Sequence, residues 1–223
     1  MFDLPRRLVA EALGTCLLVA TVVGSGIMAD RLTDDTALAL LGNTLPTGAI
    51  LVVLVSILGP ISGAHLNPVV TIVSALRRTL RPAEAAGYVA AQLAGGVAGT
   101  LAAHVMFELP LLQASSTIRT GGGQWLAEGI ATFGLVATIL AGVVVARTAV
   151  PWLVGLYITA AYWFTASTSF ANPAVTVARA LTDSFSGIRP LDVPAFIAAQ
   201  VAGALVAMVV MGWLLKPAKE IAA

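Results

Sequence analysis

Long stretches without charged residues alternate with short charged segments along the chain, and this pattern predicts helices that cross a membrane. A helix needs about 20 mostly apolar residues to cross the hydrocarbon core of a bilayer. The stretches between charges are residues 12–29, 36–76, 85–107, 129–146, 148–178 and 193–215. Two of them, 36–76 and 148–178, are longer than one crossing requires, and in each the surplus begins at an Asn-Pro pair. The pattern predicts six crossings and two additional short helices.

The composition agrees with a multi-pass protein embedded in a lipid bilayer. Only 10% of the residues are charged and 58% are hydrophobic, whereas a soluble domain carries about 25% charged residues. The net charge of +1 gives no indication of a nucleic-acid partner. Cys16 is the single cysteine, which excludes an internal disulfide, and we interpret it as a small apolar residue. Residues 1–24 resemble a signal peptide, but Glu11 interrupts their apolar core, so we expect a retained first helix.

Arginine and lysine residues are unevenly divided between the two sides that this topology creates. If the N-terminus lies in the cytoplasm, eight of them are inside and four are outside, as the positive-inside tendency requires. The inner residues are Arg6, Arg7, Arg77, Arg78, Arg81, Arg147, Lys216 and Lys219, and the outer ones are Arg31, Arg119, Arg179 and Arg189. We therefore expect a protein of the inner (plasma) membrane with both termini in the cytoplasm.

Three short motifs occur twice in the same order, which indicates an internal repeat. AEALGT (10–15) returns as AEGIAT (127–132), HLNPVVT (65–71) as FANPAVT (170–176), and YVAAQLAGG (88–96) as FIAAQVAGA (196–204). Each half contains three crossings, so the second half enters from the opposite side, as in many transport proteins. We expect residues 1–223 to form one transmembrane channel domain, with inverted repeats at about 1–107 and 124–216 joined by a loop at 108–123. The alternative is a simple six-helix bundle with an accidental likeness.

Each Asn-Pro pair has the chemistry of a helix start inside the membrane. Asparagine is a favoured N-cap, and proline fits the first helical position because its missing N–H needs no partner there. About ten residues follow each pair, enough for about 15 Å of helix, or half of the hydrocarbon core. Two opposed half-helices would meet near mid-depth, where their positive N-terminal ends repel cations. Together with the carbonyls of the preceding stretches, 59–66 and 167–171, they suit a narrow path for neutral, hydrogen-bonding solutes.

These residues resemble those of the aquaporins and aquaglyceroporins, and the likeness covers essentially the whole chain. The likeness rests on the two boxes, SGAHLNP before the first, AAQ in the third helix of each half, and a glutamate in the first. The box residues, expected at the pore centre, are Asn67, Pro68, Val69, Asn172, Pro173 and Ala174. The resemblance implies an all-α membrane protein, a right-handed bundle of six transmembrane helices with two re-entrant half-helices. It also implies a pore through each subunit of a homotetramer.

The resemblance also assigns roles to residues outside the boxes. Glu11 and Glu128 are expected to be buried and to accept hydrogen bonds from the re-entrant loops, with a proton relay as the alternative. The residues expected to line the pore or its mouth are Gly63, Ala64, His65, Phe170 and Arg179. His65 either contacts the solute or only braces its loop. His104 is interpreted as structural.

The position after the second box carries the main departure from the family. Family members have an arginine there that forms part of the outer constriction, and this chain has Val175. Counting from the two asparagines places the filter at Thr47, Ala160, Ser169 and Val175, a small and uncharged set. The resemblance therefore implies a wider opening without a fixed charge. Arg179 lies one helical turn beyond Val175, and either forms a positive gate or is a helix-end arginine that extends to the membrane surface.

The segment NPAVTVARALTDSFSGIRP resembles bacterial channels associated with arsenic resistance. This resemblance implies passage of arsenite as neutral As(OH)3, with methylated arsenicals, glycerol and water as further small neutral solutes. A plain water and glycerol facilitator and a proton-coupled secondary transporter are the alternatives. An enzyme is not indicated, because the two histidines stand 39 positions apart and no metal-ligand spacing or phosphate-binding loop is present. We expect no cofactor and no bound metal.

Overall fold

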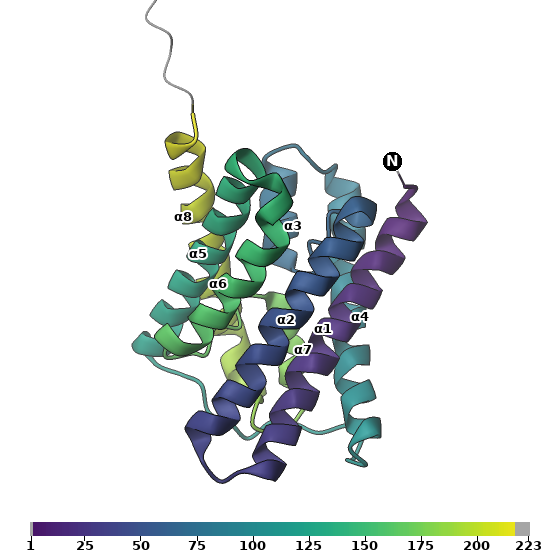
Figure 1. The fold of residues 1–223 in the computed structure, drawn as a ribbon, viewed down its shortest axis with the longest axis vertical. Helices are drawn as coiled ribbons and strands as arrows, with labels where there is room; N and C mark the ends of the chain where they lie inside the picture. The colour runs from purple at the N-terminus through teal and green to yellow at the C-terminus, as the bar shows by residue number, and fades with distance from the viewer. Residues whose placement is uncertain (1, 217–223) are drawn as a thin grey trace, which may run out of the picture.

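The computed structural model describes residues 2–216 and contains helices and loops, with no strand in that range. Its α-helices are α1 (Leu4–Leu32), α2 (Thr36–Ser62), α3 (Pro68–Leu76), α4 (Pro82–Met106), α5 (Gly122–Val145), α6 (Val150–Phe164), α7 (Pro173–Arg179) and α8 (Val193–Leu214). Two 3-10 turns, η1 (Arg147–Ala149) and η2 (Pro190–Asp192), precede α6 and α8. In Figure 1 the six long helices (α1, α2, α4, α5, α6 and α8) lie side by side, and the short α3 and α7 lie among them in opposite halves of the bundle. The predicted all-α fold class is confirmed.

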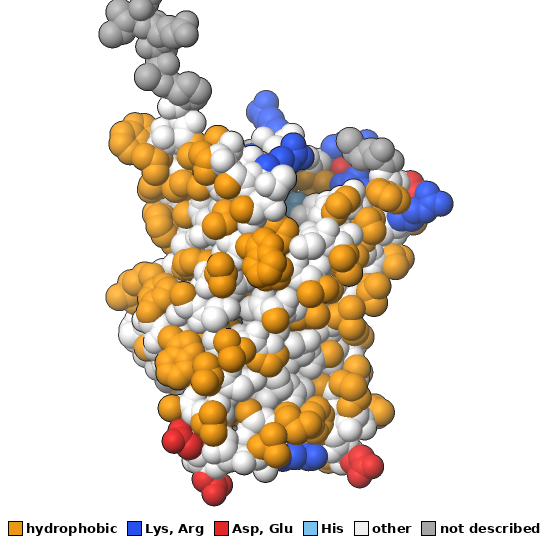
Figure 2. Space-filling model, in the orientation of Figure 1, with side chains coloured by type: hydrophobic (Ala, Val, Ile, Leu, Met, Phe, Trp, Pro, Cys, Tyr) orange, Lys and Arg blue, Asp and Glu red, His pale blue; other side chains and the backbone are white. Residues whose placement is uncertain are grey.

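Five of the six long helices are individually long and apolar enough to cross a membrane: α1, α2, α4, α5, and α8 with its preceding turn. The sixth, α6, has 15 residues and is about 22 Å long. It is extended by η1 at one end and by the irregular residues 165–171 at the other. Hydrophobic side chains cover the flank of the bundle in Figure 2, whereas charged side chains gather at its two ends. This is the surface of a multi-pass membrane protein.

The two ends of the bundle differ in charge. The end with the N-terminus carries most of the lysine and arginine side chains visible in Figure 2, and acidic side chains mark the opposite end. The described part of α8 ends at the same end of the bundle as the start of α1, on the opposite side (Figure 1). We refer to this end as the inner end and to the other as the outer end. Lys219, which the sequence places at the inner side, lies outside the described residues.

The two half-helices begin where the sequence predicts. Asn67 caps α3 by accepting the N–H of Val69 at 3.0 Å, and Asn172 caps α7 by accepting the N–H of Ala174 at 3.0 Å. A proline follows each cap in the first turn. With nine and seven residues, the helices are about 14 and 11 Å long. The second is shorter than expected because the turn-forming residues 182–184 (Thr-Asp-Ser) follow it closely.

Candidate solute pathway

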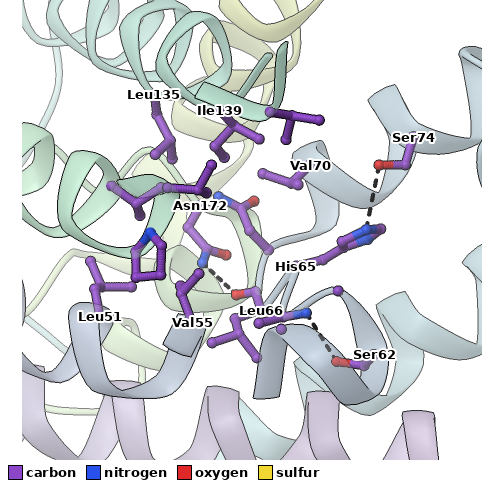
Figure 3. A pocket seen from close by; sticks show the side chains of 18 of the residues that line it. Leu51, Val55, Ser62, His65, Leu66, Val70, Ser74, Leu135, Ile139 and Asn172 are labelled. Atoms are coloured by element: carbon purple, nitrogen blue, oxygen red, sulfur yellow. Dashed lines mark hydrogen bonds between the residues drawn. The ribbon is translucent and has the colours of Figure 1, made fainter. Parts of the chain in front are cut away.

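The starts of α3 and α7 are joined by a reciprocal pair of hydrogen bonds. The side-chain amide of Asn67 donates to the carbonyl of Ala171 at 2.8 Å, and that of Asn172 donates to the carbonyl of Leu66 at 2.8 Å (Figure 3). A carboxamide has two N–H groups, and this bond uses one of them. Both asparagines also line a cavity, so each has a second N–H in a side chain at the cavity wall.

The backbone before each asparagine has an unusual conformation. Leu66 and Ala171, whose carbonyls accept the reciprocal bonds, have φ of 49° and 48°, and Ala64 and Ser169 have φ of 44° and 51°. Non-glycine residues rarely adopt positive φ, and each such residue costs about 1–3 kcal/mol. The surrounding structure must therefore hold both stretches in place.

Glu11 braces the stretch before α3. Its buried carboxylate accepts hydrogen bonds from the hydroxyl of Ser62 at 2.6 Å, the N–H groups of His65 and Leu66 at 2.9 and 2.7 Å, and the amide of Gln92 at 2.8 Å. Four donors occupy the two carboxylate oxygens. The carboxylate therefore satisfies backbone groups that hydrocarbon could not.

Glu128 makes the corresponding contacts before α7. It accepts from the N–H groups of Phe170 and Ala171 at 2.8 and 2.9 Å and from the amide of Gln200 at 2.6 Å. Like Glu11, it is completely buried and does not line the cavity. Both acids therefore hold irregular backbone in the interior of the bundle.

Two glutamines that were not predicted as functional residues complete these networks. Gln92 links Glu11 to the hydroxyl of Thr71 at 2.9 Å, and Gln200 contacts the hydroxyl of Thr176 at 2.8 Å in the same way. The signal that could have revealed them is the motif AAQ, which repeats on the third crossing of each half. A polar residue repeated on an apolar helix indicates a buried hydrogen-bond partner.

A cavity of about 920 Å³ extends from the inner end to the level of the asparagines and beyond. Arg7, Arg77 and Arg147 are among the residues that line its inner part, and Asn67 and Asn172 line its middle. Figure 3 shows apolar side chains of α2 and α5 around Asn172, so the cavity wall opposite the polar groups is apolar. The remaining box residues, Pro68, Val69, Pro173 and Ala174, are buried in helix packing and do not line the cavity.

Three of the four residues expected in the filter line the outer part of this cavity. They are Thr47 of α2, Ser169 before α7, and Val175 within α7. Val175 is 5% exposed and directly follows the second Asn-Pro-Ala box. The structure brings these three together on the outer side of the asparagines.

Ala160, the fourth residue, lies on the exposed face of α6 and is not part of the cavity wall, so its assignment to the filter is corrected. Val154, Ile158 and Tyr162 line the wall from α6, at the four-residue spacing of one helical face. Counting back from Asn172 fails here because α6 ends at Phe164 and irregular backbone separates it from α7.

The residues expected along the pathway are divided between the cavity wall and the surrounding protein. Gly63, Ala64, His65 and Phe170 line the cavity. His65 also contacts the hydroxyls of Thr71 at 3.1 Å and Ser74 at 3.4 Å (Figure 3), so bracing and exposure to solute coexist. Arg179 is not among the lining residues. His104 is buried outside the cavity, with its Nδ1 2.9 Å from the carbonyl of Leu111, in a structural position.

The connecting segment 108–123 folds over the outer end of the bundle. Ser115 donates its N–H to the carbonyl of Ala180, and Ser116 donates both its N–H and its hydroxyl to Asp183 at 2.8 Å. These two bonds lower the pKa of the Asp183 carboxyl, because they favour its ionised form. Arg119 donates to the carbonyls of Gly187 and Ser167. The outer end is therefore covered by this segment and by residues 180–192.

No group of three or more metal-ligating side chains occurs within residues 2–216.

The geometry defines the class of protein, a multi-pass membrane channel. The major intrinsic protein family model matches residues 2–150 and 141–222, and the chain belongs to this family, that of the aquaporins. It is 66% identical over 220 residues to the aquaglyceroporin AqpS of Rhizobium meliloti (strain 1021), covering 99% of this chain and 94% of the relative.

More distant relatives agree with this placement. Aquaporin NIP2-1 of Zea mays is 31% identical over 189 residues, which is 80% of this chain and 62% of the relative. The X-ray structure of the aquaglyceroporin from Plasmodium falciparum matches with a TM-score of 0.68 at 23% identity, covering 93% of this chain and 95% of that one. This last likeness shows a shared fold.

Proposed function

We propose that the protein is a passive channel for small uncharged solutes, with arsenite as As(OH)3 as its main solute. Glycerol, water and methylated arsenicals are further candidates. The proposal draws support from a relative named an aquaglyceroporin that is 66% identical over nearly the whole chain. Its mechanism depends on groups already described: asparagine amides that donate to hydroxyl oxygens, and an apolar wall that accepts the rest of the solute.

The observation that carries the proposal is Val175 in the wall of the cavity. A valine side chain occupies less of the cross-section than an arginine and brings no charge to this position. Solutes larger than water, with several hydroxyl groups, gain room between Val175, Thr47 and Ser169. Ions still have to shed their water in an apolar passage, which costs several kcal/mol, so the larger opening favours neutral molecules.

We further propose the organisation that the sequence implies. Residues 1–107 and 124–216 act as inverted repeats of one channel domain, and four copies assemble as a homotetramer in the inner membrane with cytoplasmic termini. Equivalent contacts of Glu11 and Glu128 favour the repeat. The basic inner end favours the orientation.

A proton-coupled transporter is the less favoured alternative. It needs a carboxylate that exchanges protons with the pathway, and the two intramembrane candidates, Glu11 and Glu128, are buried outside the cavity with their oxygens engaged by donors. A plain water and glycerol facilitator differs only in the solute, so transport measurements decide between them.

Replacing Val175 with arginine is expected to lower As(OH)3 and glycerol uptake by about tenfold while water flow falls less, because the guanidinium narrows the passage. Such a loss equals a barrier increase of about 1.4 kcal/mol. Stopped-flow light scattering of proteoliposomes measures the uptake rates of all three solutes. Val175→Ile, an uncharged substitution at the same position, is the control. A wild-type protein that conducts water alone would contradict the proposed function.

A further inference from the structure

Arg179, at the outer end of the cavity, is a fully buried cation without a carboxylate partner. Its side chain is 1% exposed, which excludes the helix-end role in which the group reaches the membrane surface. Its Nε donates to the carbonyl of Ser186, and its guanidinium carbon lies 3.4 Å from the centre of the Phe170 ring. Within residues 2–216 it forms no ion pair, and its Nη1 has no hydrogen-bond partner.

Arg119 brings a second guanidinium to the same ring. It comes from the connecting segment 108–123, and its guanidinium carbon lies 5.0 Å from the centre of Phe170. Hydrogen bonds to the carbonyls of Gly187 and Ser167 hold it there, at 2.7 and 3.2 Å. Its side chain likewise makes no salt bridge in the described part of the chain. Phe170 therefore contacts two cations through its ring.

Its stacking on Phe170 places the guanidinium group of Arg179 directly beside the outer part of the cavity. Phe170 lines the cavity, and on its other side it packs against Phe196 of α8. Ser186, which accepts a hydrogen bond from the same guanidinium group, lies beside Gly26 of α1. A solute at Val175 is therefore next to Phe170, and the guanidinium carbons of Arg179 and Arg119 lie 3.4 and 5.0 Å from the centre of that ring.

We propose that Arg179, with Arg119 and Phe170, forms the charge- and size-selecting barrier of the channel, one helical turn outside the position of Val175. This inference rests on the proposed channel function and adds the residues that set its selectivity. Two unpaired positive charges in a medium of low dielectric repel cations strongly. Neutral polyols do not experience this repulsion and are limited only by the space beside Phe170, so they pass while cations are excluded.

Arg179→Ala should raise the leak of protons and K⁺ into proteoliposomes by about tenfold or more, because a nearby charge changes an ion's barrier by an amount of this order. Glycerol uptake should rise severalfold, since the barrier becomes wider. Arg31→Ala is the matched control. Arg31 is also an outer-end arginine stacked on a phenylalanine, with its guanidinium carbon 5.2 Å from the Phe107 ring, but it is exposed and Phe107, unlike Phe170, does not line the cavity. Its removal should change neither rate.

Further variants separate charge from size. Arg179→Lys should keep the low ion leak of the wild type, because the lysine keeps the positive charge. Its glycerol uptake should be faster, because the lysine loses the planar stacking on Phe170. Arg119→Ala, on the partly exposed connecting segment, should raise ion leak by about threefold, and it provides the test if Arg179→Ala does not fold. If Arg179→Ala folds and has the ion leak and glycerol uptake of the wild type, the inference is overturned. If Arg179→Ala does not fold, wild-type ion leak in Arg119→Ala overturns it instead. A wild-type protein that passes no neutral solute, yet becomes leaky to ions on Arg179→Ala, would refute the proposed function and leave the barrier supported.

Discussion

Replacing Glu128 with alanine is expected to prevent formation of a stable channel. The substitution leaves the N–H groups of Phe170 and Ala171 and the amide of Gln200 buried without their acceptor. Each orphaned donor costs about 1–3 kcal/mol, so the total loss is about 3 kcal/mol or more. That is a large part of the stability of a typical domain. Membrane yield and thermal stability of the purified protein in detergent measure the effect.

Two further variants make the interpretation of Glu128→Ala specific. Glu128→Gln should be destabilised less than Glu128→Ala, because the carboxamide keeps one oxygen as an acceptor. It should still be less stable than the wild type, because its NH2 group faces a donor. Glu108→Gln, at an exposed glutamate outside the bundle interior, should match the wild type. Glu11→Ala should behave like Glu128→Ala, because Glu11 accepts three corresponding bonds and a fourth from the hydroxyl of Ser62. A stable Glu128→Ala protein that lost only pH-dependent transport would favour the proton-relay interpretation.

Local signals explain why the half-helices could be predicted from the sequence. An asparagine cap and a proline at the first turn act within three residues, so Asn67-Pro68 and Asn172-Pro173 reveal their role without tertiary information. The crossings follow from chain length and the absence of charge, which are also local properties. The bracing glutamates are expected on the same basis, because an intramembrane carboxylate needs a polar partner inside the protein.

The outer end of the pathway could not be predicted in the same way, because it depends on where irregular backbone leads the chain. Residues 165–171 are not helical, so counting through them assigned Ala160 instead of Ile158 and Tyr162 to the wall. The position of Arg179 depends on its hydrogen bond to Ser186, seven residues away, and on its stacking against Phe170. The sequence shows that position 175 carries no charge, but only the packed structure shows that Arg179 is buried and stacked on Phe170 in the cavity wall.

Glycines at two helix crossings determine how closely the bundle can pack. A Cβ atom at Gly203 of α8 would lie 2.2 Å from the carbonyl oxygen of Gly129 in α5. In the other half, a Cβ at Gly95 of α4 would lie 2.2 Å from the carbonyl oxygen of Ala12 in α1. Backbone on a packed helix cannot move aside cheaply, and small residues at such crossings allow membrane helices to associate closely.

Gly203→Val is therefore expected to separate α8 from α5 and to abolish transport of every solute, with overpacking of a helix crossing costing about 3 kcal/mol or more. Gly95→Val should do the same to α4 and α1. Gly212→Ala on α8 is the control, since a Cβ there meets no other atom within 4 Å, and it should be neutral or slightly stabilising. Thermal stability in detergent and water flow in proteoliposomes measure both effects. Wild-type stability in Gly203→Val would show that the two helices are free to separate, and the close crossing would not be what holds Glu128 and Gln200 within hydrogen-bonding distance.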